Sequence, residues 1–170
     1  MKKILVYVSL VIYTCCVQQE PMNKIVYSEK AKQDILLGEI NRSGLLTDQF
    51  KDWFNREYNS YEVGKETLDS ISIESWDDVK ITIILATWCP DSKRELPRFL
   101  KILDYLEYPE ENITYISVNR DKLVPGMDLA NLNMKKVPTM IFYRAGNEIG
   151  RIIESPVQSL EKDIKKFMNN

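Results

Sequence analysis

Hydrophobic residues form two kinds of pattern in the middle of the chain, and each pattern predicts a different element. Residues 79–86 are almost continuously apolar, and residues 113–119 are rich in β-branched side chains. Runs of this kind are typical of strands buried on both faces of a sheet. Between them, residues 92–108 repeat leucine and phenylalanine at helical spacing, with Pro97 inside the segment. We therefore predict a strand, a helix that Pro97 kinks, and a second strand.

The last third of the chain predicts a short helix, a hairpin and a closing helix. The short helix lies near residues 127–132, and the hairpin joins residues 139–143 to residues 148–153 around Gly146. Residues 159–168 carry an apolar stripe at helical spacing. Crossovers followed by a hairpin predict an α/β fold, with a central mixed sheet and helices on both faces.

Residues 18–75 have weaker patterns, and we expect them to form an N-terminal extension that is partly helical. One short helix is predicted within residues 28–40, a longer one within residues 45–61, and a third at residues 65–75. The sequence does not indicate which face of the main domain this extension covers.

The longest of these three helices carries a stripe of large apolar side chains, formed by Leu46, Phe50, Trp53, Phe54 and Tyr61. Such a stripe can be a ligand surface, but more often it is core, and we interpret it as core. Thr47 or Asp48 is the candidate N-cap, because a short oxygen-bearing side chain accepts a hydrogen bond from the first turn.

Residues 1–17 have the pattern of a targeting segment. Two lysines precede an apolar run of about ten residues, which is too short to span a bilayer. Cys15 and Cys16 close the segment, which resembles a bacterial lipoprotein signal, so both are lipidation candidates; Tyr13 is bulkier than that signal prefers, and simple secretion is the alternative. We expect an exported protein of the cell envelope, either periplasmic or attached to the membrane through a lipid anchor.

The composition excludes several classes of function. The chain has no histidine, so neither a histidine-assisted nucleophile nor a histidine-ligated metal site can form. The net charge is −2, with acidic and basic residues interspersed, and no basic face indicates nucleic-acid binding. The chain has three cysteines, two of them adjacent near the N-terminus, too few for a four-cysteine zinc site. We expect no metal and no nucleic-acid partner.

The remaining cysteine, Cys89, lies in the stretch TWCPDSKRELP, after the strand predicted at residues 79–86 and just before the helix predicted at residues 92–108. A thiol just ahead of a helix meets unpaired N–H groups and the positive end of the helix dipole, which favours the thiolate. Lys93 and Arg94 add positive charge in the first turn, and Asp91 opposes them. Pro90 suits the first position of a helix.

These features give the chain a resemblance to thioredoxin-fold proteins, and in particular to the exported branch that includes the TlpA-like disulfide reductases. Trp88-Cys89 follows a core strand, and Pro97 stands where the family's helix carries a kinking proline. Val137-Pro138-Thr139 stands in the place of the family's cis-proline loop, ahead of a hairpin. The resemblance covers about residues 76–168, and we take residues 76–170 as the thioredoxin-like domain.

The resemblance implies roles for particular residues. Cys89 would be the nucleophile, and five neighbours would bind the substrate: Trp88, Pro90, Val137, Pro138 and Thr139. A cis peptide before Pro138 would present the backbone of Val137 beside the sulfur, where it can pair with an extended substrate segment.

The chain departs from the family's pattern at two positions. Ser92 stands where the resolving cysteine of a CxxC site would be, and a serine hydroxyl cannot release a mixed disulfide. Ile83 stands where thioredoxins carry a buried acid. We expect Ser92 either to donate a hydrogen bond to the Cys89 thiolate or to be the N-cap of the helix, and the two roles are compatible.

The favoured hypothesis is therefore an envelope protein that uses the single thiol of Cys89 for exchange with protein or glutathione disulfides, with an external thiol resolving the intermediate. The alternative is a redox-inactive binding module for an envelope client, with the groove beside Pro138 and the aromatic stripe as candidate surfaces. An iron–sulfur cluster of the kind that some CxxS glutaredoxins hold is disfavoured, because Pro90 and Asp91 replace the glycine and aromatic residue of that motif. We expect no cofactor.

Overall fold

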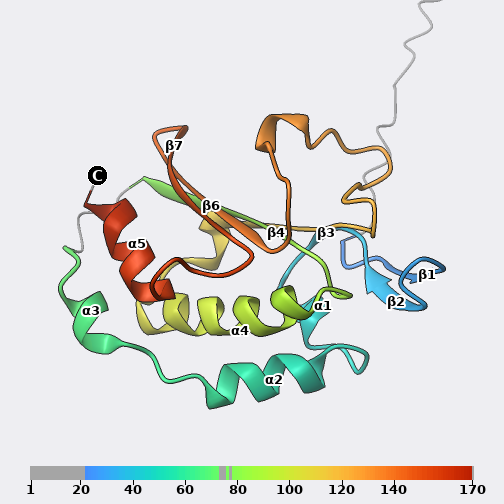
Figure 1. Ribbon diagram of the computed structural model, residues 1–170, viewed down its shortest axis with the longest axis horizontal. Coiled ribbons are helices and arrows are strands. Elements are labelled where there is room, and N and C mark those ends of the chain that lie inside the picture. The colour runs from blue at the N-terminus through green and yellow to red at the C-terminus, as the bar shows by residue number, and fades with distance from the viewer. Residues whose placement is uncertain (1–21, 73–75, 77, 170) are drawn as a thin grey trace, which may run out of the picture.

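A five-stranded mixed sheet forms the centre of the protein (Figure 1). The computed structural model describes residues 22–169 except 73–75 and 77. The strand order is β3 (Gly38–Ile40), β5 (Ile113–Ser117), β4 (Val79–Leu85), β6 (Thr139–Arg144) and β7 (Asn147–Ile153). Strands β4 and β5 are parallel and the other pairs are antiparallel. The mixed sheet and the hairpin predicted from the sequence are confirmed.

Helices α4 (Pro90–Tyr105) and α5 (Leu160–Met168) lie against one face of this sheet, and α2 (Lys51–Ser60) forms a further layer on α4 (Figure 1). Two shorter helices, α1 (Arg42–Leu45) and α3 (Lys65–Asp69), precede and follow α2. The opposite face is covered by the segment between β5 and β6, which includes a 3-10 helix at Ala130–Leu132. A second 3-10 helix, Glu110–Asn112, leads into β5.

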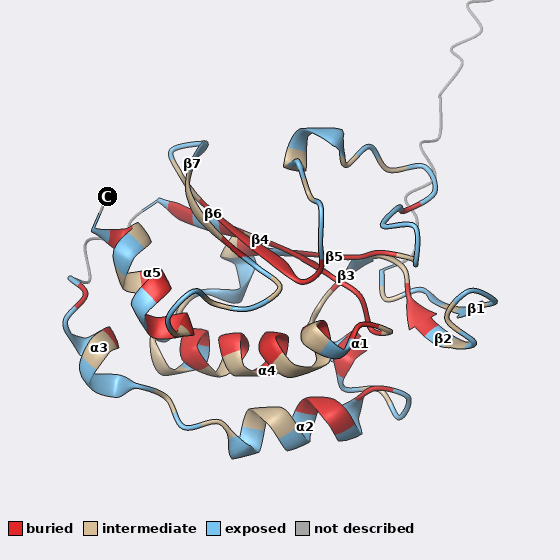
Figure 2. Ribbon diagram, in the orientation of Figure 1, coloured by how far each residue is buried: buried red, intermediate tan, exposed pale blue. Residues whose placement is uncertain are grey.

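Strand β4 supplies side chains to the core on both sides of the sheet. Ile81, Ile83 and Leu85 pack with the helices, whereas Ile84 and, just past the strand, Ala86 pack with the segment that covers the opposite face. Alternation of this kind follows from the two-residue period of a strand. It explains why residues 83–86 are apolar without interruption, and Figure 2 shows the burial of this part of the chain.

The short helix predicted within residues 28–40 is wrong, because this segment forms strands. β1 (Ile25–Ser28) and β2 (Gln33–Leu36) make a hairpin, and β3 then pairs with β5 at the edge of the main sheet. Lys32 ends the hairpin turn with a left-handed φ of 55°, and Gly38, the first residue of β3, adopts a φ of 96°. Strand β3 is stabilised by β5, a partner distant in sequence, which local periodicity does not reveal.

The interpretation of the aromatic stripe as core is confirmed for Phe50, Trp53 and Phe54, which are buried, whereas Leu46 is 44% exposed. The predicted N-cap is wrong. The N-cap of α2 is Phe50, and the hydroxyl of Thr47 donates instead to the carbonyl of Gly44 in the preceding turn.

Other helix boundaries differ by a few residues from those expected. Helix α4 begins at Pro90, consistent with the preference of proline for the first helical position, and ends at Tyr105. Ser159 caps α5, its side chain accepting from the N–H of Lys162 at 3.2 Å. The predicted signal segment, residues 1–17 with Cys15 and Cys16, lies outside the described residues. Within the described ranges, no helix is long and apolar enough to cross a membrane.

Candidate functional site

Cys89 lies at the junction of β4 and α4, where it is the N-cap residue of α4. Its N–H donates to the carbonyl of Ala86 at 2.9 Å, and its own carbonyl accepts from the N–H of Lys93 at 3.0 Å. The residue is 7% exposed. The thiol is therefore held by the first turn of the helix, at the position that the sequence predicts for a nucleophile.

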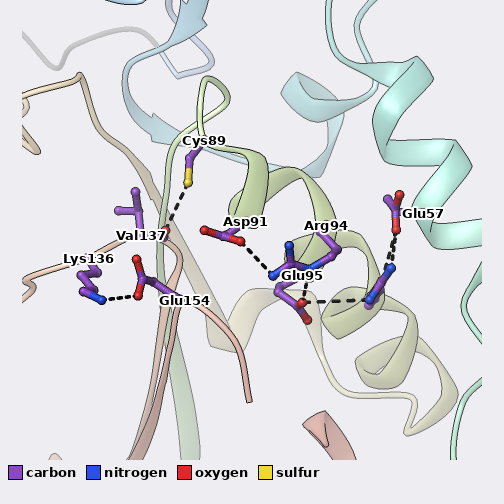
Figure 3. Close-up of polar contacts among 9 residues, drawn as sticks. Glu57, Cys89, Asp91, Arg94, Glu95, Lys136, Val137 and Glu154 are labelled. Atoms are coloured by element: carbon purple, nitrogen blue, oxygen red, sulfur yellow. Dashed lines mark hydrogen bonds and ion pairs between the residues drawn. The ribbon is translucent and has the colours of Figure 1, made fainter. Parts of the chain in front are cut away.

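The peptide bond between Val137 and Pro138 is cis, as the resemblance implied, and it lies next to Cys89. Cys89 Sγ donates to the carbonyl oxygen of Val137 at 3.3 Å (Figure 3). Thr139 Oγ1 donates to the carbonyl of Lys136 at 2.7 Å and so ties the two ends of this loop together. The structure thus brings together Cys89, Val137 and Pro138.

Trp88 and Pro90 lie on either side of Cys89. The indole Nε1 of Trp88 donates to the carbonyl of Val118 at 3.0 Å, and the guanidinium of Arg120 lies 4.4 Å from the centre of its ring. A cation over an aromatic face is attracted by the ring quadrupole. Pro90 is exposed at the first position of α4. Trp88 is therefore fixed at its N–H end and covered by a cation on one face.

Ser92 is completely buried, and its Oγ accepts a hydrogen bond from the N–H of Ala86 at 3.2 Å. The N-cap role expected for Ser92 is wrong, because Cys89 is the N-cap and Ser92 is the third residue of α4. A hydrogen bond from Ser92 to a Cys89 thiolate stays a prediction. Ile83, also completely buried, gives the interior an apolar group where the family carries an acid.

A chain of alternating charges runs along α4 away from Cys89 (Figure 3). Arg94 pairs with Asp91 at 2.8 Å and with Glu95 at 2.6 Å, and the hydrogen bond to Glu95 is the main cause of the raised pKa of Arg94. Arg98 continues the chain, 4.0 Å from Glu95 and 2.7 Å from Glu57 of α2. The positive charge predicted for Arg94 is therefore neutralised by carboxylates.

Sequence reasoning missed the contact between the N-terminal extension and the turn that carries Cys89. The N–H of Leu36, at the end of β2, donates to Thr87 Oγ1 at 3.1 Å, and Ser117 Oγ donates to the Leu36 carbonyl at 2.7 Å. Both hydroxyls are buried. The extension therefore attaches two residues ahead of Cys89. Thr87 and Ser117 at the ends of apolar runs were the available signal, but their partner could not be read from sequence.

A family model described as thioredoxin matches residues 45–165. The chain belongs to the thioredoxin family. The match begins well before Trp76, where the resemblance read from the sequence began, so it also includes α2 and α3.

Two thioredoxin relatives are similar in sequence. Mitochondrial thioredoxin-2 of Schizosaccharomyces pombe is 31% identical over 94 residues, which make up 55% of this chain and 65% of the relative. The match thus spans slightly less than two thirds of that relative's length. Thioredoxin-like protein R548 of Acanthamoeba polyphaga mimivirus is 28% identical over 101 residues, covering 58% of this chain and 71% of the relative.

Two solved structures are also similar. Oxidised mitochondrial thioredoxin 3 from Saccharomyces cerevisiae has 26% identity and a TM-score of 0.38, over 64% of this chain and 97% of that chain. A protein of unknown function from Pseudomonas aeruginosa has 17% identity and a TM-score of 0.49, over 78% of this chain and 90% of that chain. The family assignment rests on the family match.

Proposed function

We propose that this protein is a thiol–disulfide exchange protein of the cell envelope that uses Cys89 as its only reacting thiol. The observation that carries this proposal is the position of Cys89 Sγ, at the N-terminus of α4 and 3.3 Å from the carbonyl of Val137 in the cis-proline loop. This arrangement places the sulfur beside a backbone segment that can pair with an extended substrate. Thiol–disulfide redox chemistry is the general activity of the family.

The proposed reaction has two balanced steps. The Cys89 thiolate attacks one sulfur of a substrate disulfide, so that a mixed disulfide with Cys89 forms and the other substrate sulfur leaves as a thiolate. An external thiolate then attacks the mixed disulfide, takes the bound substrate sulfur into a new disulfide and releases Cys89 as a thiolate. Ser92 has no sulfur with which to perform this second step, so an external thiol is required.

Glutathione can be the external thiol when the substrate is a glutathionylated protein. Cys89 would take the glutathionyl group and release the protein thiol, and free glutathione would then leave as glutathione disulfide. Exchange with a protein disulfide, followed by attack of another client thiol, would instead isomerise the client. In both versions the Cys89 thiolate is the nucleophile that attacks the substrate disulfide.

The test uses the full chain with Cys15→Ser and Cys16→Ser, so that Cys89 is the remaining cysteine. A glutathionylated peptide is incubated with glutathione, and release of the peptide thiol is followed by mass spectrometry. The protein should accelerate the release, and Cys89→Ala should reduce the rate to that of glutathione alone. An unchanged rate in Cys89→Ala would sink the proposal.

Envelope location is the second part of the proposal and rests on the pattern of residues 1–17. Export predicts removal of this segment, and a lipid anchor predicts acylation of Cys15 or Cys16. Labelling of expressing bacteria with an alkyne-tagged palmitate, compared between the native chain and the Cys15→Ser and Cys16→Ser variants, tests the anchor. Fractionation of the cells tests the location.

A binding module is the second candidate, because Cys89 is only 7% exposed. In that case the surface beside Pro138 would hold a client without turnover. Cys89→Ser would then leave client capture from an envelope extract intact, whereas the exchange proposal predicts loss of every covalent complex that a reducing agent can release.

A further inference from the structure

The side chain of Arg120 lies over the indole ring of Trp88, the residue directly before Cys89. The guanidinium carbon is 4.4 Å from the ring centre, and the indole N–H donates to the carbonyl of Val118. Arg120 is exposed, but a cation over an aromatic face is attracted by the ring quadrupole. Trp88 therefore holds a positive charge next to the candidate nucleophile.

The guanidinium of Arg120 has no oxygen acceptor in the described part of the chain. Every other arginine interacts with a carboxylate or a backbone carbonyl. Within residues 22–72, 76 and 78–169, Arg120 forms no hydrogen bond or ion pair, and the adjacent carboxylate of Asp121 is bound by Lys30 at 2.6 Å. A guanidinium carries five N–H donors, and an aromatic ring supplies no oxygen for them, so these donors remain available to a ligand.

The sheet places Arg120 and the cis-proline loop on opposite sides of Cys89. Strand β4, which leads to Cys89, pairs with β5 on one side and with β6 on the other. Arg120 follows β5, and Val137, whose carbonyl accepts from the Cys89 thiol, precedes β6. Neighbouring strands are about 4.8 Å apart, so about 10 Å separates the two sides. An extended substrate chain that lies beside Val137 spans this distance in about three residues.

Two other cations drawn with Cys89 in Figure 3 already have carboxylate partners. Lys136 binds Glu154 at 2.5 Å, and Arg94 binds Asp91 at 2.8 Å. An ion pair satisfies much of the charge of both its members, so a substrate carboxylate would have to compete with Glu154 or Asp91 for these cations. It would meet no such competitor at the guanidinium that lies over Trp88.

We propose that Arg120 selects substrates with a carboxylate within about three residues of the cysteine that Cys89 attacks. The planar fork of a guanidinium matches the two oxygens of a carboxylate, and the contact with Trp88 limits the rotamer freedom that binding would cost. This inference deepens the proposed function and rests on it: the substrate class would be a disulfide with an acidic group nearby. The covalent step is unchanged, because the Cys89 sulfur joins one substrate sulfur and the other leaves as a thiolate.

Two peptide disulfides test this selection. Each is a symmetric dimer of a short peptide with one cysteine, and the residues two positions before and after that cysteine are glutamate in one dimer and glutamine in the other. The reduced full chain with Cys15→Ser and Cys16→Ser is mixed with each dimer. Intact mass of acid-quenched samples follows the disulfide between Cys89 and the peptide.

The rates are corrected for the intrinsic reactivity of each dimer. N-acetylcysteine amide, a thiol without charge on its carboxyl or amino group, is allowed to attack the same two dimers, and each protein rate is divided by the rate of this reaction. After the correction, the glutamate dimer should react with Cys89 about fivefold faster than the glutamine dimer, which is near the most that one exposed ion pair supplies.

Three variants assign the preference to Arg120. Arg120→Gln should abolish it, so that the corrected rates of the two dimers become equal. Arg120→Lys should retain part of it, because an ammonium keeps the charge but loses the fork. Lys122→Gln is the matched control: Lys122 is exposed and two residues away, its loss changes the net charge by the same amount as Arg120→Gln, and the full preference should remain.

Glutathione disulfide distinguishes the two sources of such a carboxylate, because the glycine carboxylate of glutathione directly follows its cysteine. Its rate is compared with that of the glutamine dimer in the parent chain and in Arg120→Gln. A relative loss in Arg120→Gln for the glutamate dimer alone identifies an acidic client segment as the substrate. A relative loss for glutathione disulfide alone identifies glutathione.

Two outcomes would overturn the inference. One is that Arg120→Gln slows neither the glutamate dimer nor glutathione disulfide relative to the glutamine dimer. The other is that Lys122→Gln removes the preference as fully as Arg120→Gln, which would assign it to net charge. Both outcomes leave exchange by Cys89 intact. Failure of Cys89 to form a disulfide with any of the three substrates would instead reject the proposed function, and this inference with it.

Discussion

The sulfur of Cys89 and the carbonyl oxygen of Val137 lie 3.3 Å apart, although 48 positions separate the two residues in the chain. Cys89 is fixed by the first turn of α4, and Val137 by the loop that leads into β6. Since β4 and β6 pair antiparallel, with Ile84 opposite Thr139, the end of β4 and the start of β6 lie side by side. The candidate site is therefore a product of sheet topology.

Ser92→Cys should give the chain a self-resolving site. The side chain of residue 92 lies in the first turn of α4, and the variant restores the CxxC spacing at which a second thiolate can attack a mixed disulfide. After incubation with oxidised dithiothreitol, neither thiol of the variant, at position 89 or 92, should react with an alkylating reagent. Both should react again after reduction. Full alkylation of both thiols after oxidation would contradict this expectation; Ser92→Ala is the control.

Ser92→Ala should destabilise the fold by about 1–3 kcal/mol, because the buried N–H of Ala86 loses its acceptor and stays away from water. Urea denaturation measures the change in the free energy of unfolding. The matched control is Ser60→Ala, which removes an exposed hydroxyl bonded to the Glu57 carbonyl and should cost much less. Equal losses of stability in Ser92→Ala and Ser60→Ala would mean that the hydrogen bond from Ala86 to Ser92 does not stabilise the fold.

Thr87→Val should loosen the N-terminal extension while keeping the shape of the side chain. The variant removes the Oγ1 that accepts from the N–H of Leu36, and leaves the bond from Ser117 to the Leu36 carbonyl in place. Amide hydrogen exchange at Leu36 should accelerate, whereas exchange in the centre of β4 should change little. Unchanged protection at Leu36 would show that Ser117 and the packing of β2 are sufficient.

Glu161→Gln should change how stability depends on pH. Burial alone would raise the pKa of Glu161, but hydrogen bonds from the N–H of Gly64 and from Tyr61 outweigh it, and the pKa lies below its ordinary value of 4.5. A carboxyl group whose pKa is lower in the folded state stabilises the fold above the unfolded-state pKa. That contribution is lost as pH falls through the folded-state pKa.

Thermal unfolding from pH 3 to pH 7 measures this effect. The parent chain should lose more stability than Glu161→Gln below about pH 4, and should be the more stable of the two near neutral pH. Glu62→Gln, in the same connection but exposed, should follow the parent curve. The Glu161 carboxylate joins α5 to the connection between α2 and α3. Parallel curves of stability against pH for the parent chain and Glu161→Gln would contradict the role assigned to it.

Local patterns in the sequence were sufficient to predict several helices and strands. The apolar run of β4, the helical spacing of α4 and the stripe of α5 each reflect the burial of neighbouring residues on one element, so periodicity was sufficient. The position of Cys89 ahead of a helix followed from the same local pattern. Even the burial of Phe50 and Trp53 could be predicted, because aromatic residues at helical spacing are usually core.

The position of the N-terminal extension and its contacts depend on long-range packing and could not be predicted. β1 and β2 pair with each other, but β3 pairs with β5, which is distant in sequence. No local period distinguishes a strand that pairs at a sheet edge from a short helix. The contact of Leu36 with Thr87, the acceptor role of Ser92 and the position of Arg120 over Trp88 likewise depend on which groups meet in space. Hydrogen bonds between distant segments are fixed by packing, so a single sequence does not reveal them.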